Sequence, residues 1–376
     1  MNSSNSSRVL ILSDWYLPGI KAGGPIRSVD GIIQALKGEL DIWLITSDRD
    51  LNDTNPYADI ETDKWLEQNG IHIYYAGPDN IGPIIEAELH KTWSAVYMNS
   101  LFSFRFTLRP LMICNRLKIN KVVLAPRGML GSGALQIKKN KKQLFLSVAR
   151  WFGFYKRVTW HVSSKFEKQQ VSAYFKEANI EILPSLSKMK SSKAYYENVT
   201  NDCLQMVLVA RMAKVKNVDF LLSVLNSVST SYQLDLYGPI EDKDYWRQCQ
   251  EKIQLNKLNV NYKGELPNET VLDTIKNYDL FVLPTTGENF GHSILESLTA
   301  SVPVLISNRT PWVELEDRQA GFDLELNEPQ SWVNKIEYFS NLTHSERQQW
   351  RQGAWKLSVE KLDQSKLVKK YVKLFS

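Results

Sequence analysis

The chain has 376 residues, of which 43% are hydrophobic and 23% charged, and its formal net charge is +5. A chain of this length is too long to fold around one ordinary hydrophobic core, so two domains are expected. The three cysteines form no Cys-x-x-Cys pair and the five histidines have no metal-ligand spacing. A disulfide framework and a structural zinc site are therefore excluded, and a reducing compartment is favoured. The mild positive charge suits acidic ligands or an anionic surface.

The amino-acid sequence leads us to expect no targeting signal. The polar residues 1–7 run directly into a strand pattern, so we expect no signal peptide. No apolar run approaches the length of a membrane span. We therefore expect a cytoplasmic protein whose contact with a membrane, on the inner face of the plasma membrane, is peripheral. No nucleic-acid-binding module is recognisable, so no nucleic-acid partner is expected.

The first half of the chain alternates strand patterns with helical spacing. Strands are expected at 8–13, 41–46, 71–75, 95–98 and 121–125. A helix is expected from Ile26 to Leu36, with Pro25 in its first turn, and the loop before it contains Gly23 and Gly24. Such alternation predicts a mostly parallel sheet that is covered on both faces.

The pattern restarts after a Ser- and Lys-rich segment, Pro184–Lys193, which is the expected linker. Strands are expected at 204–209, 233–237, 260–263, 280–283 and 302–306, with a helix from Asn217 to Val228. The tail, His344–Ser376, has helical spacing. The predicted class is α/β, with two Rossmann-like parallel-sheet domains, 1–185 and 186–355, and a C-terminal helix, 356–376.

The most informative segment follows the strand at 280–283. A loop with Glu288 leads into a helix that begins near Phe290–His292 and carries Glu296. The first turn of that helix has free N–H groups, which suit an anion. Carboxylates beside an anion site fit a ligand with both hydroxyls and phosphate, such as a nucleotide sugar. The alternative is a pair of solvated glutamates.

Two cations follow the strand at 204–209. Arg211 and Lys216 lie in the loop after this strand. Cleavage of a sugar–phosphate bond releases a diphosphate, and fixed cations aimed at its oxygens stabilise that charge. The alternative is a pair of solvated cations at a helix start.

In order and spacing, Glu-x7-Glu with Phe-Gly inside it and Arg-x4-Lys before it resemble the retaining glycosyltransferases of family 4, of the bacterial polysaccharide-biosynthesis type. The resemblance implies the GT-B fold, in which two Rossmann-like domains face a central cleft. The first domain would bind the acceptor and the second the nucleotide sugar, and the last helix would pack back onto the first domain. The resemblance is strong from Met206 to about Phe322 and weaker before.

The resemblance also implies roles for individual residues. The catalytic set would be Glu288, which meets the donor sugar, with Arg211 and Lys216, which hold the diphosphate. The donor-binding set would be Gly23, Gly24, Leu266, Asn289, Phe290, Gly291, His292 and Glu296. The acceptor-binding set would be Asn99 and Arg127, each at the end of a predicted strand. Gly23-Gly24 is also an ordinary turn, and Arg127 is equally suited to a structural ion pair.

The family implies no cofactor and no metal, with the nucleotide-diphosphate sugar as donor substrate. The leaving diphosphate would itself take the acceptor proton. Two rivals stay open: a GT-B-like enzyme of another class, such as a nucleotide-sugar epimerase or a phosphorylase, and a non-catalytic sugar- or nucleic-acid-binding protein. A cofactor-dependent phosphorylase would need a pyridoxal lysine motif, which the sequence does not show.

The segment 138–157 is basic and aromatic. It interleaves seven cations, Lys138, Lys139, Lys141, Lys142, Arg150, Lys156 and Arg157, with five aromatic side chains. It predicts an amphipathic helix that lies on an anionic membrane surface, or one packed by its aromatic face with its lysines in water. With the family resemblance, the first interpretation suggests a polyprenyl-diphosphate-linked glycan acceptor in capsule, exopolysaccharide or lipopolysaccharide assembly.

Overall fold

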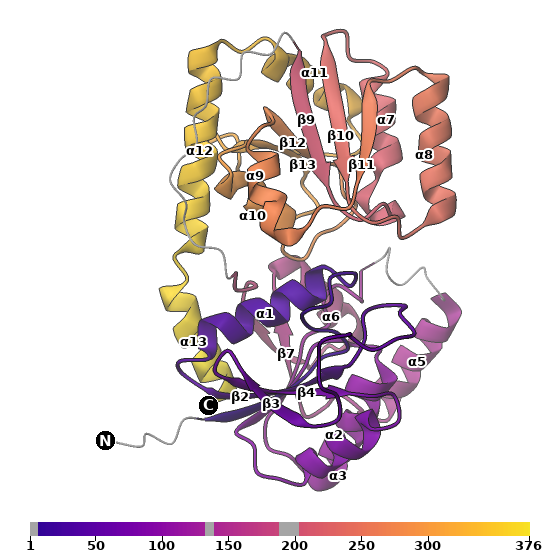
Figure 1. Ribbon diagram of the computed structural model, residues 1–376, viewed down its shortest axis with the longest axis vertical. Helices are drawn as coiled ribbons and strands as arrows, with labels where there is room; N and C mark the ends of the chain where they lie inside the picture. Colours follow the sequence, from indigo (N-terminus) through magenta and orange to yellow (C-terminus); the bar gives the residue numbers. More distant parts are fainter. Residues whose placement is uncertain (1–6, 132–138, 188–202) are drawn as a thin grey trace. The chain divides into compact units, whose positions relative to one another are not determined.

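The computed structural model describes residues 7–131, 139–187 and 203–376. It divides into two compact units, unit 1 (Met1–Lys188 with Gln364–Ser376) and unit 2 (Met189–Asp363) (Figure 1). The expected break between 355 and 356 falls inside helix α12 (His344–Leu362), and the structure places the division after this helix. Only residues 184–187 of the expected linker are described, and they have no regular structure.

Unit 1 contains an eight-stranded sheet in the order β3-β4-β2-β1-β5-β6-β7-β8. All neighbouring strands are parallel except β3 and β4, which are antiparallel. In register, Val9 of β1 pairs with Ile42 of β2 and Ala95 of β5. The strands are β1 (Arg8–Leu12), β2 (Asp41–Ser47), β3 (Trp65–Gln68), β4 (Ile71–Ala76), β5 (Ala95–Met98), β6 (Val122–Leu124), β7 (Val158–Val162) and β8 (Asn179–Ile182).

Helices cover both faces of this sheet. They are α1 (Gly24–Leu36), α2 (Ile81–Leu89), the π-helical turn η1 (Phe104–Leu108), α3 (Arg109–Leu117), α5 (Lys139–Trp151), α6 (Lys165–Tyr174) and α13 (Ser365–Phe375). Alternate residues of β1 enter different cores: Val9 and Ile11 pack with α1 and α13, whereas Leu10 and Leu12 pack with α2, α3 and α5. This alternation explains why the strand reads as a continuous apolar run.

Unit 2 contains a six-stranded, fully parallel sheet in the order β11-β10-β9-β12-β13-β14. Its strands are β9 (Leu204–Val209), β10 (Tyr232–Tyr237), β11 (Val260–Gly264), β12 (Leu280–Leu283), β13 (Val304–Ser307) and β14 (Gly321–Leu324). Its helices and turns are η2 (Lys214–Lys216), α7 (Val218–Leu225), α8 (Lys243–Leu255), η3 (Asn268–Thr270), α9 (Val271–Ile275), α10 (His292–Thr299), α11 (Pro329–Ser340) and α12. One continuous core joins the strands and the α-helices of this unit.

The structure confirms the predicted strands and corrects several details. Strands β3, β7, β8 and β14 were not predicted. The tail is not one helix, because α12 ends at Leu362 and α13 begins at Ser365. The basic segment is helical only to Trp151, after which the chain turns, and Lys138 lies outside the described residues. Among the helices that the structure describes, none is long and apolar enough to cross a bilayer.

Candidate functional site

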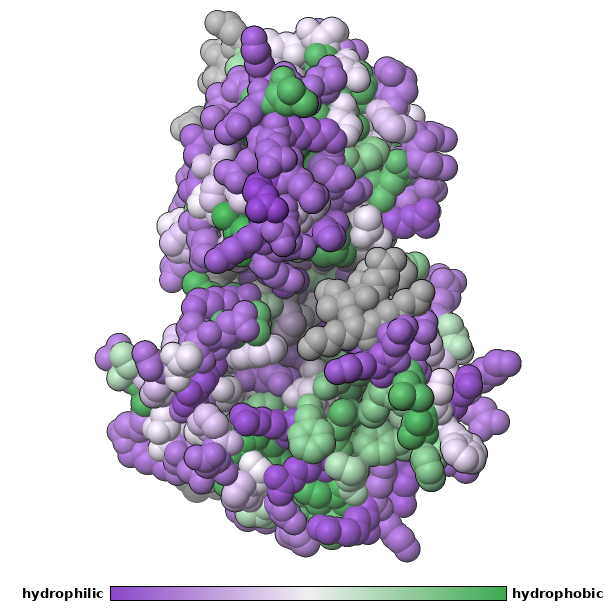
Figure 2. All heavy atoms as spheres, turned by 90° about the vertical axis from the view of Figure 1, so that its right-hand side faces the viewer, coloured by the Kyte–Doolittle hydropathy of each residue, from purple (hydrophilic) through white to green (hydrophobic). Residues whose placement is uncertain are grey.

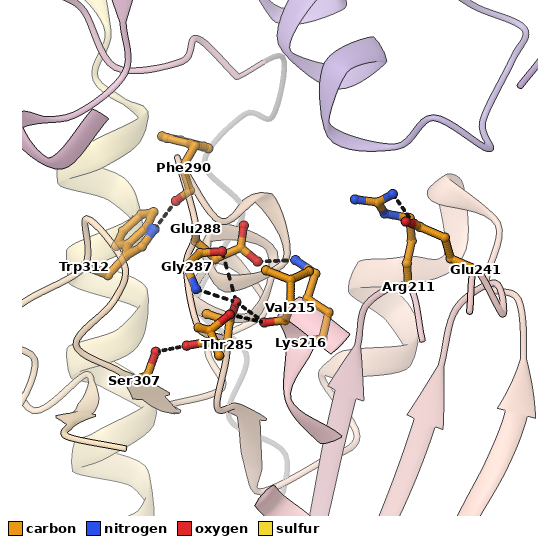
Figure 3. Close-up of polar contacts among 11 residues, drawn as sticks. Arg211, Val215, Lys216, Glu241, Thr285, Gly287, Glu288, Phe290, Ser307 and Trp312 are labelled. Carbon is orange, nitrogen blue, oxygen red and sulfur yellow. Dashed lines mark hydrogen bonds and ion pairs between the residues drawn. The ribbon is translucent and has the colours of Figure 1, made fainter. Parts of the chain in front are cut away.

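The carboxyl ends of the strands of unit 2 carry the predicted catalytic residues and the predicted donor residues except Gly23 and Gly24, which lie in unit 1. This edge is the expected place for a ligand site in an open parallel sheet. Strands β9 and β12 are neighbours in the sheet. The loops that follow them are joined by backbone contacts: the Thr286 N–H donates to the Val215 carbonyl at 2.8 Å, and the Thr285 hydroxyl donates to the same carbonyl at 3.0 Å (Figure 3). The loop after β9 is thereby fixed against the loop after β12.

Lys216 and Glu288 form an ion pair between these two loops (Figure 3). Their side chains are only 14% and 15% exposed, so the pair is largely shielded from water. The Glu288 N–H donates to the Arg309 carbonyl at 3.0 Å, which fixes the glutamate backbone. The carboxylate therefore neutralises the cation, and an anionic ligand that binds Lys216 has to compete with Glu288.

Arg211 lies in the same loop as Lys216 but pairs with another carboxylate. Its guanidinium contacts Glu241, in the loop between β10 and α8, and Figure 3 shows this pair apart from Lys216 and Glu288. The two side chains are 36% and 45% exposed. The two cations expected to act together thus each hold a carboxylate here. Sequence reasoning missed Glu241, whose only signal is its position in a loop that follows a strand.

Gly238 lets the loop after β10 pass close to the loop that holds Arg211. Its φ is +133°, and a Cβ at this position would lie 2.0 Å from the Ala210 carbonyl oxygen and 3.3 Å from the Arg211 nitrogen. Only glycine fits this close approach. The residue therefore helps to place the Arg211 backbone.

The loop from Glu288 ends at Gly291, the N-cap of α10, which has a φ of +78°. A Cβ on Gly291 would lie 2.7 Å from Cδ1 of Ile294. The indole N–H of Trp312 donates to the Phe290 carbonyl (Figure 3). The Phe290 ring lies 4.8 Å from the His292 ring. These contacts fix the turn from which α10 starts.

Glu296 and Leu266 do not lie on a solvated loop or on an exposed helix face. Glu296 lies on α10 and is only 8% exposed, so the alternative of an exposed helix face is wrong. Leu266 follows β11, is half-buried and packs against the core of unit 2. Asn289 and His292 are half-buried in the loop and the first turn of α10. The carboxyl edge of this sheet thus gathers Arg211, Lys216, Leu266, Glu288, Asn289, Phe290, Gly291, His292 and Glu296.

The predicted acceptor residues form a connected group in unit 1. The Arg127 Nε–H donates to the Asn99 side-chain oxygen at 2.7 Å. The Asn99 amide donates in turn to the Pro25 carbonyl at 3.3 Å. Pro25 follows Gly23 and Gly24, so the Gly-Gly loop, Asn99 and Arg127 are joined at the carboxyl edge of the sheet of unit 1. Gly23 has a φ of +62° and open space around it.

A buried polar group lies behind Arg127 and was not predicted. The Arg127 Nη2 donates to the Tyr97 hydroxyl at 2.7 Å, and this hydroxyl lies 3.0 Å from Nδ1 of His161. Burial raises the pKa of Tyr97 to about 12. Burial, with the nearby charge of Arg127, lowers the pKa of His161 to about 3. The histidine is therefore neutral, and the arginine carries the charge of the group.

Asp14 is a further acid at this edge, half-buried and two residues after the end of β1. Burial raises its pKa from 3.8 to about 6, against the lowering effect of a hydrogen bond from the Ser103 hydroxyl at 2.5 Å. Glu167 holds the loop of Arg127, because it accepts the Gly128 N–H and the Ser163 N–H, each at 2.7 Å. In the described residues, no cluster of three or more His, Cys, Asp or Glu side chains has a metal-binding arrangement.

Comparison with known proteins adds three findings. Residues 196–356 match the family described as glycosyl transferases group 1. The chain is 24% identical over 230 residues to an uncharacterized 41.2 kDa protein in the cps region of Klebsiella pneumoniae, covering 58% of this chain and 59% of that protein. It is 26% identical over 124 residues to the GtfA subunit of a UDP-N-acetylglucosamine–peptide N-acetylglucosaminyltransferase of Streptococcus agalactiae, covering 32% and 23%. The chain thus spans less than two thirds of the length of these curated relatives.

Solved structures share the fold over nearly the whole chain. Alr3699/HepE of Anabaena, solved with UDP and glucose, has a TM-score of 0.72 at 15% identity over 98% of both chains. The lipopolysaccharide outer core galactosyltransferase WaaB has a TM-score of 0.65 at 14% identity over 98% of both chains. At such identities the likeness shows the fold, which is the GT-B fold expected from the sequence.

Proposed function

Because residues 196–356 match the glycosyl transferases group 1 family, we propose that the protein transfers a sugar from a nucleotide-diphosphate sugar to an acceptor hydroxyl. The observation that carries this proposal is the Lys216–Glu288 pair at the carboxyl edge of the sheet of unit 2. A shielded cation beside a carboxylate fits a ligand with phosphate next to sugar hydroxyls. HepE, which shares the fold, was solved with UDP and glucose.

We further propose that transfer retains the anomeric configuration and needs no metal. The bond between the anomeric carbon and the phosphate oxygen breaks, and the electron pair leaves with the diphosphate. Lys216 and Arg211 stabilise the growing negative charge on the phosphate oxygens. The acceptor oxygen attacks from the same face and gives its proton to the leaving phosphate. Glu288 positions the sugar and stabilises the positive charge that develops on its ring.

Ligand binding would exchange partners within the site. The Lys216 ammonium would turn from Glu288 to the phosphate, which frees the Glu288 carboxylate for the sugar. Arg211 would exchange Glu241 for phosphate in the same way, since arginine binds phosphate in a forked geometry. Phe290–His292 supply amides at the start of α10, and Glu296 would accept the ribose hydroxyls.

A panel of nucleotide sugars tests this proposal, with each free nucleotide as control. The expected result is stabilisation and slow hydrolysis of one donor, with a product of the donor's own anomeric configuration in proton NMR. Glu288→Gln should lose most turnover, whereas Glu251→Gln, an exposed glutamate on α8, should retain it. An inverted product would contradict retention. Conversion of the donor sugar without any acceptor would favour an epimerase.

The surface of α5 supports an acceptor at a membrane. Leu146 and Ala149 of this helix are buried, but Leu144, Val148 and Trp151 form a second apolar stripe that is 68%, 43% and 84% exposed. Figure 2 shows hydrophobic surface gathered on the lower part of the face that carries this helix. Cations border the stripe, and Lys141, Arg150, Lys156 and Arg157 are exposed. This combination is typical of helices that lie on anionic membranes.

We therefore propose peripheral binding to the inner face of the plasma membrane and a polyprenyl-diphosphate-linked glycan as acceptor. The relative from a cps region is consistent with a role in capsule assembly. Sedimentation with phosphatidylglycerol vesicles tests the surface, with phosphatidylcholine vesicles as control. Binding should occur at low salt, weaken with added salt and be lost in Trp151→Ser/Phe152→Ser. Leu255→Ser, which changes a leucine that is 82% exposed on α8, should bind normally. Absence of binding at low salt would contradict the proposal.

A further inference from the structure

We propose that Tyr371 of α13, acting through His161 and Tyr97, positions the guanidinium of Arg127 for the acceptor. The role in transfer rests on the proposed function, whereas the positioning itself is a property of unit 1. The three residues come from α13, β7 and β5, which are far apart in the sequence. They are positioning residues, and Arg127 is the group that would contact the acceptor.

The contacts form one continuous chain from the helix to the arginine. The Tyr371 hydroxyl lies 2.9 Å from Nε2 of His161. Nδ1 of the same ring lies 3.0 Å from the Tyr97 hydroxyl, which accepts from Arg127 Nη2 at 2.7 Å. Tyr97, His161 and Tyr371 are 0%, 1% and 0% exposed. A buried chain of this kind has few alternative arrangements, because every unpaired polar atom would be costly.

Two backbone carbonyls at the Tyr371 end of this chain of contacts, those of Leu183 and Pro184, determine the directions of the hydrogen bonds. The Tyr371 hydroxyl donates to the Pro184 carbonyl at 3.0 Å, so its oxygen is left to accept from His161. Nε2 of His161 also lies 2.9 Å from the Leu183 carbonyl, which can only accept. The proton of His161 is therefore on Nε2, and Nδ1 accepts from the Tyr97 hydroxyl. The Tyr97 oxygen is then an acceptor for Arg127.

Arg127 is also held by its backbone and by a second side-chain contact. Its φ of +50° lies in the left-handed region, which is uncommon for a residue other than glycine. Glu167 accepts the N–H of the next residue, Gly128, at 2.7 Å and so supports this turn. On the side chain, Nε is bound to Asn99 and Nη2 to Tyr97. Two of the guanidinium nitrogens are thereby fixed from two directions.

The remaining nitrogen is the group that would meet a ligand. Among the described residues, Nη1 of Arg127 makes no hydrogen bond. Since the guanidinium is planar, fixing Nε and Nη2 also fixes the direction of the Nη1 donors. A fixed pair of N–H donors suits a phosphate or sugar oxygen of the acceptor. The orientation of the Arg127 guanidinium therefore depends, through Tyr97 and His161, on the Tyr371 hydroxyl group of α13.

The first test needs no activity. In the wild-type protein, long-range proton–nitrogen NMR of the imidazole rings, assigned with a His161→Gln variant, should show His161 as the neutral Nε2–H form. This form should persist from about pH 5 to about pH 8, where an exposed histidine titrates. A neutral ring protonated on Nδ1, or a ring that gains charge in this range, would overturn the inferred directions.

The second test compares Tyr371→Phe with Tyr155→Phe. Both variants remove one hydroxyl from a buried tyrosine of unit 1, but among the described residues the Tyr155 hydroxyl has no hydrogen-bond partner. The Nε–H signal of Arg127 should shift or broaden in Tyr371→Phe and in Tyr97→Phe, and stay unchanged in Tyr155→Phe. An Arg127 signal that is unchanged in the first two variants would overturn the proposal, whatever the outcome of activity assays.

Once a donor and an acceptor are known, steady-state kinetics of the same variants separate effects on acceptor binding and turnover from effects on donor binding. Tyr371→Phe should raise the acceptor KM or lower kcat by roughly tenfold and leave the donor KM unchanged. Equal effects in Tyr371→Phe and Tyr155→Phe would contradict positioning. A wild-type protein that turns over no nucleotide sugar would contradict the proposed function alone, since the NMR comparison still decides whether Tyr371 orders Arg127.

Discussion

Replacement of Lys216 by methionine should separate the stability of the site from its chemistry. The change leaves the Glu288 carboxylate without its cation at a position where only 15% of the side chain is exposed. Exposed ion pairs contribute below about 1 kcal/mol, whereas loss of one partner of a fully buried pair costs about 3–5 kcal/mol. For this partly buried pair we expect the free energy of unfolding to fall by about 1–3 kcal/mol. Turnover should fall by about 100- to 1000-fold, the usual effect of losing one group that stabilises transition-state charge.

The assay combines urea unfolding, calorimetric titration with nucleoside diphosphates and turnover of the donor found in the panel. Lys214→Met is the matched control, since Lys214 lies in the same turn and is exposed. Lys216→Met/Glu288→Gln should recover part of the lost stability but none of the activity, because both charges of the pair are gone. Equal stability, diphosphate affinity and turnover in Lys214→Met and Lys216→Met would refute the reasoning.

Three further changes probe the supports of the two sites. Gly238→Ala should lower the free energy of unfolding in urea by about 3 kcal/mol, because the added Cβ would meet the Ala210 carbonyl. Gly287→Ala is the control: a Cβ at Gly287 has open space, so this change should lower the free energy of unfolding by less than about 1 kcal/mol. Asp14→Asn should gain about 1–2 kcal/mol over wild type as pH rises from 3.8 to about 6, since in this range the unfolded wild-type chain loses the Asp14 proton that the folded protein still holds, and equal pH profiles would refute this assignment. Glu167→Gln should destabilise unit 1 by about 2 kcal/mol, seen in thermal unfolding, because the carboxylate accepts the Gly128 and Ser163 N–H groups, and an unchanged unfolding curve would contradict that role.

Much of the fold followed from local signals. Parallel strands that are buried on both faces produce continuous apolar runs, so β1, β2, β5, β9 and β12 were readable. The antiparallel strand β3 was missed, although the dipeptide Asn69-Gly70 before β4 is a sequence signal for a tight hairpin. In the structure these two residues have φ values of +53° and +79°, as such a turn requires. The break between α12 and α13 was missed because Asp363 and Gln364 leave the helical spacing of the tail nearly intact.

Residues of the candidate sites could be predicted only where a charged side chain lies in a loop that directly follows a predicted strand. Lys216 and Glu288 met this condition, and the structure joins them in one ion pair. Glu241 met it too, but no spacing distinguishes it from other surface glutamates. Tyr97, His161 and Tyr371 could not be found, because tertiary packing alone brings a mid-strand tyrosine, a mid-strand histidine and a tail tyrosine together.

A structure of the protein with a nucleoside diphosphate tests the central claim most directly. The account predicts diphosphate oxygens within hydrogen-bond distance of Arg211 and Lys216, with the Lys216–Glu288 and Arg211–Glu241 pairs opened by the ligand. It would be contradicted by a diphosphate bound elsewhere while both pairs stay closed, or by a protein to which no nucleoside diphosphate binds.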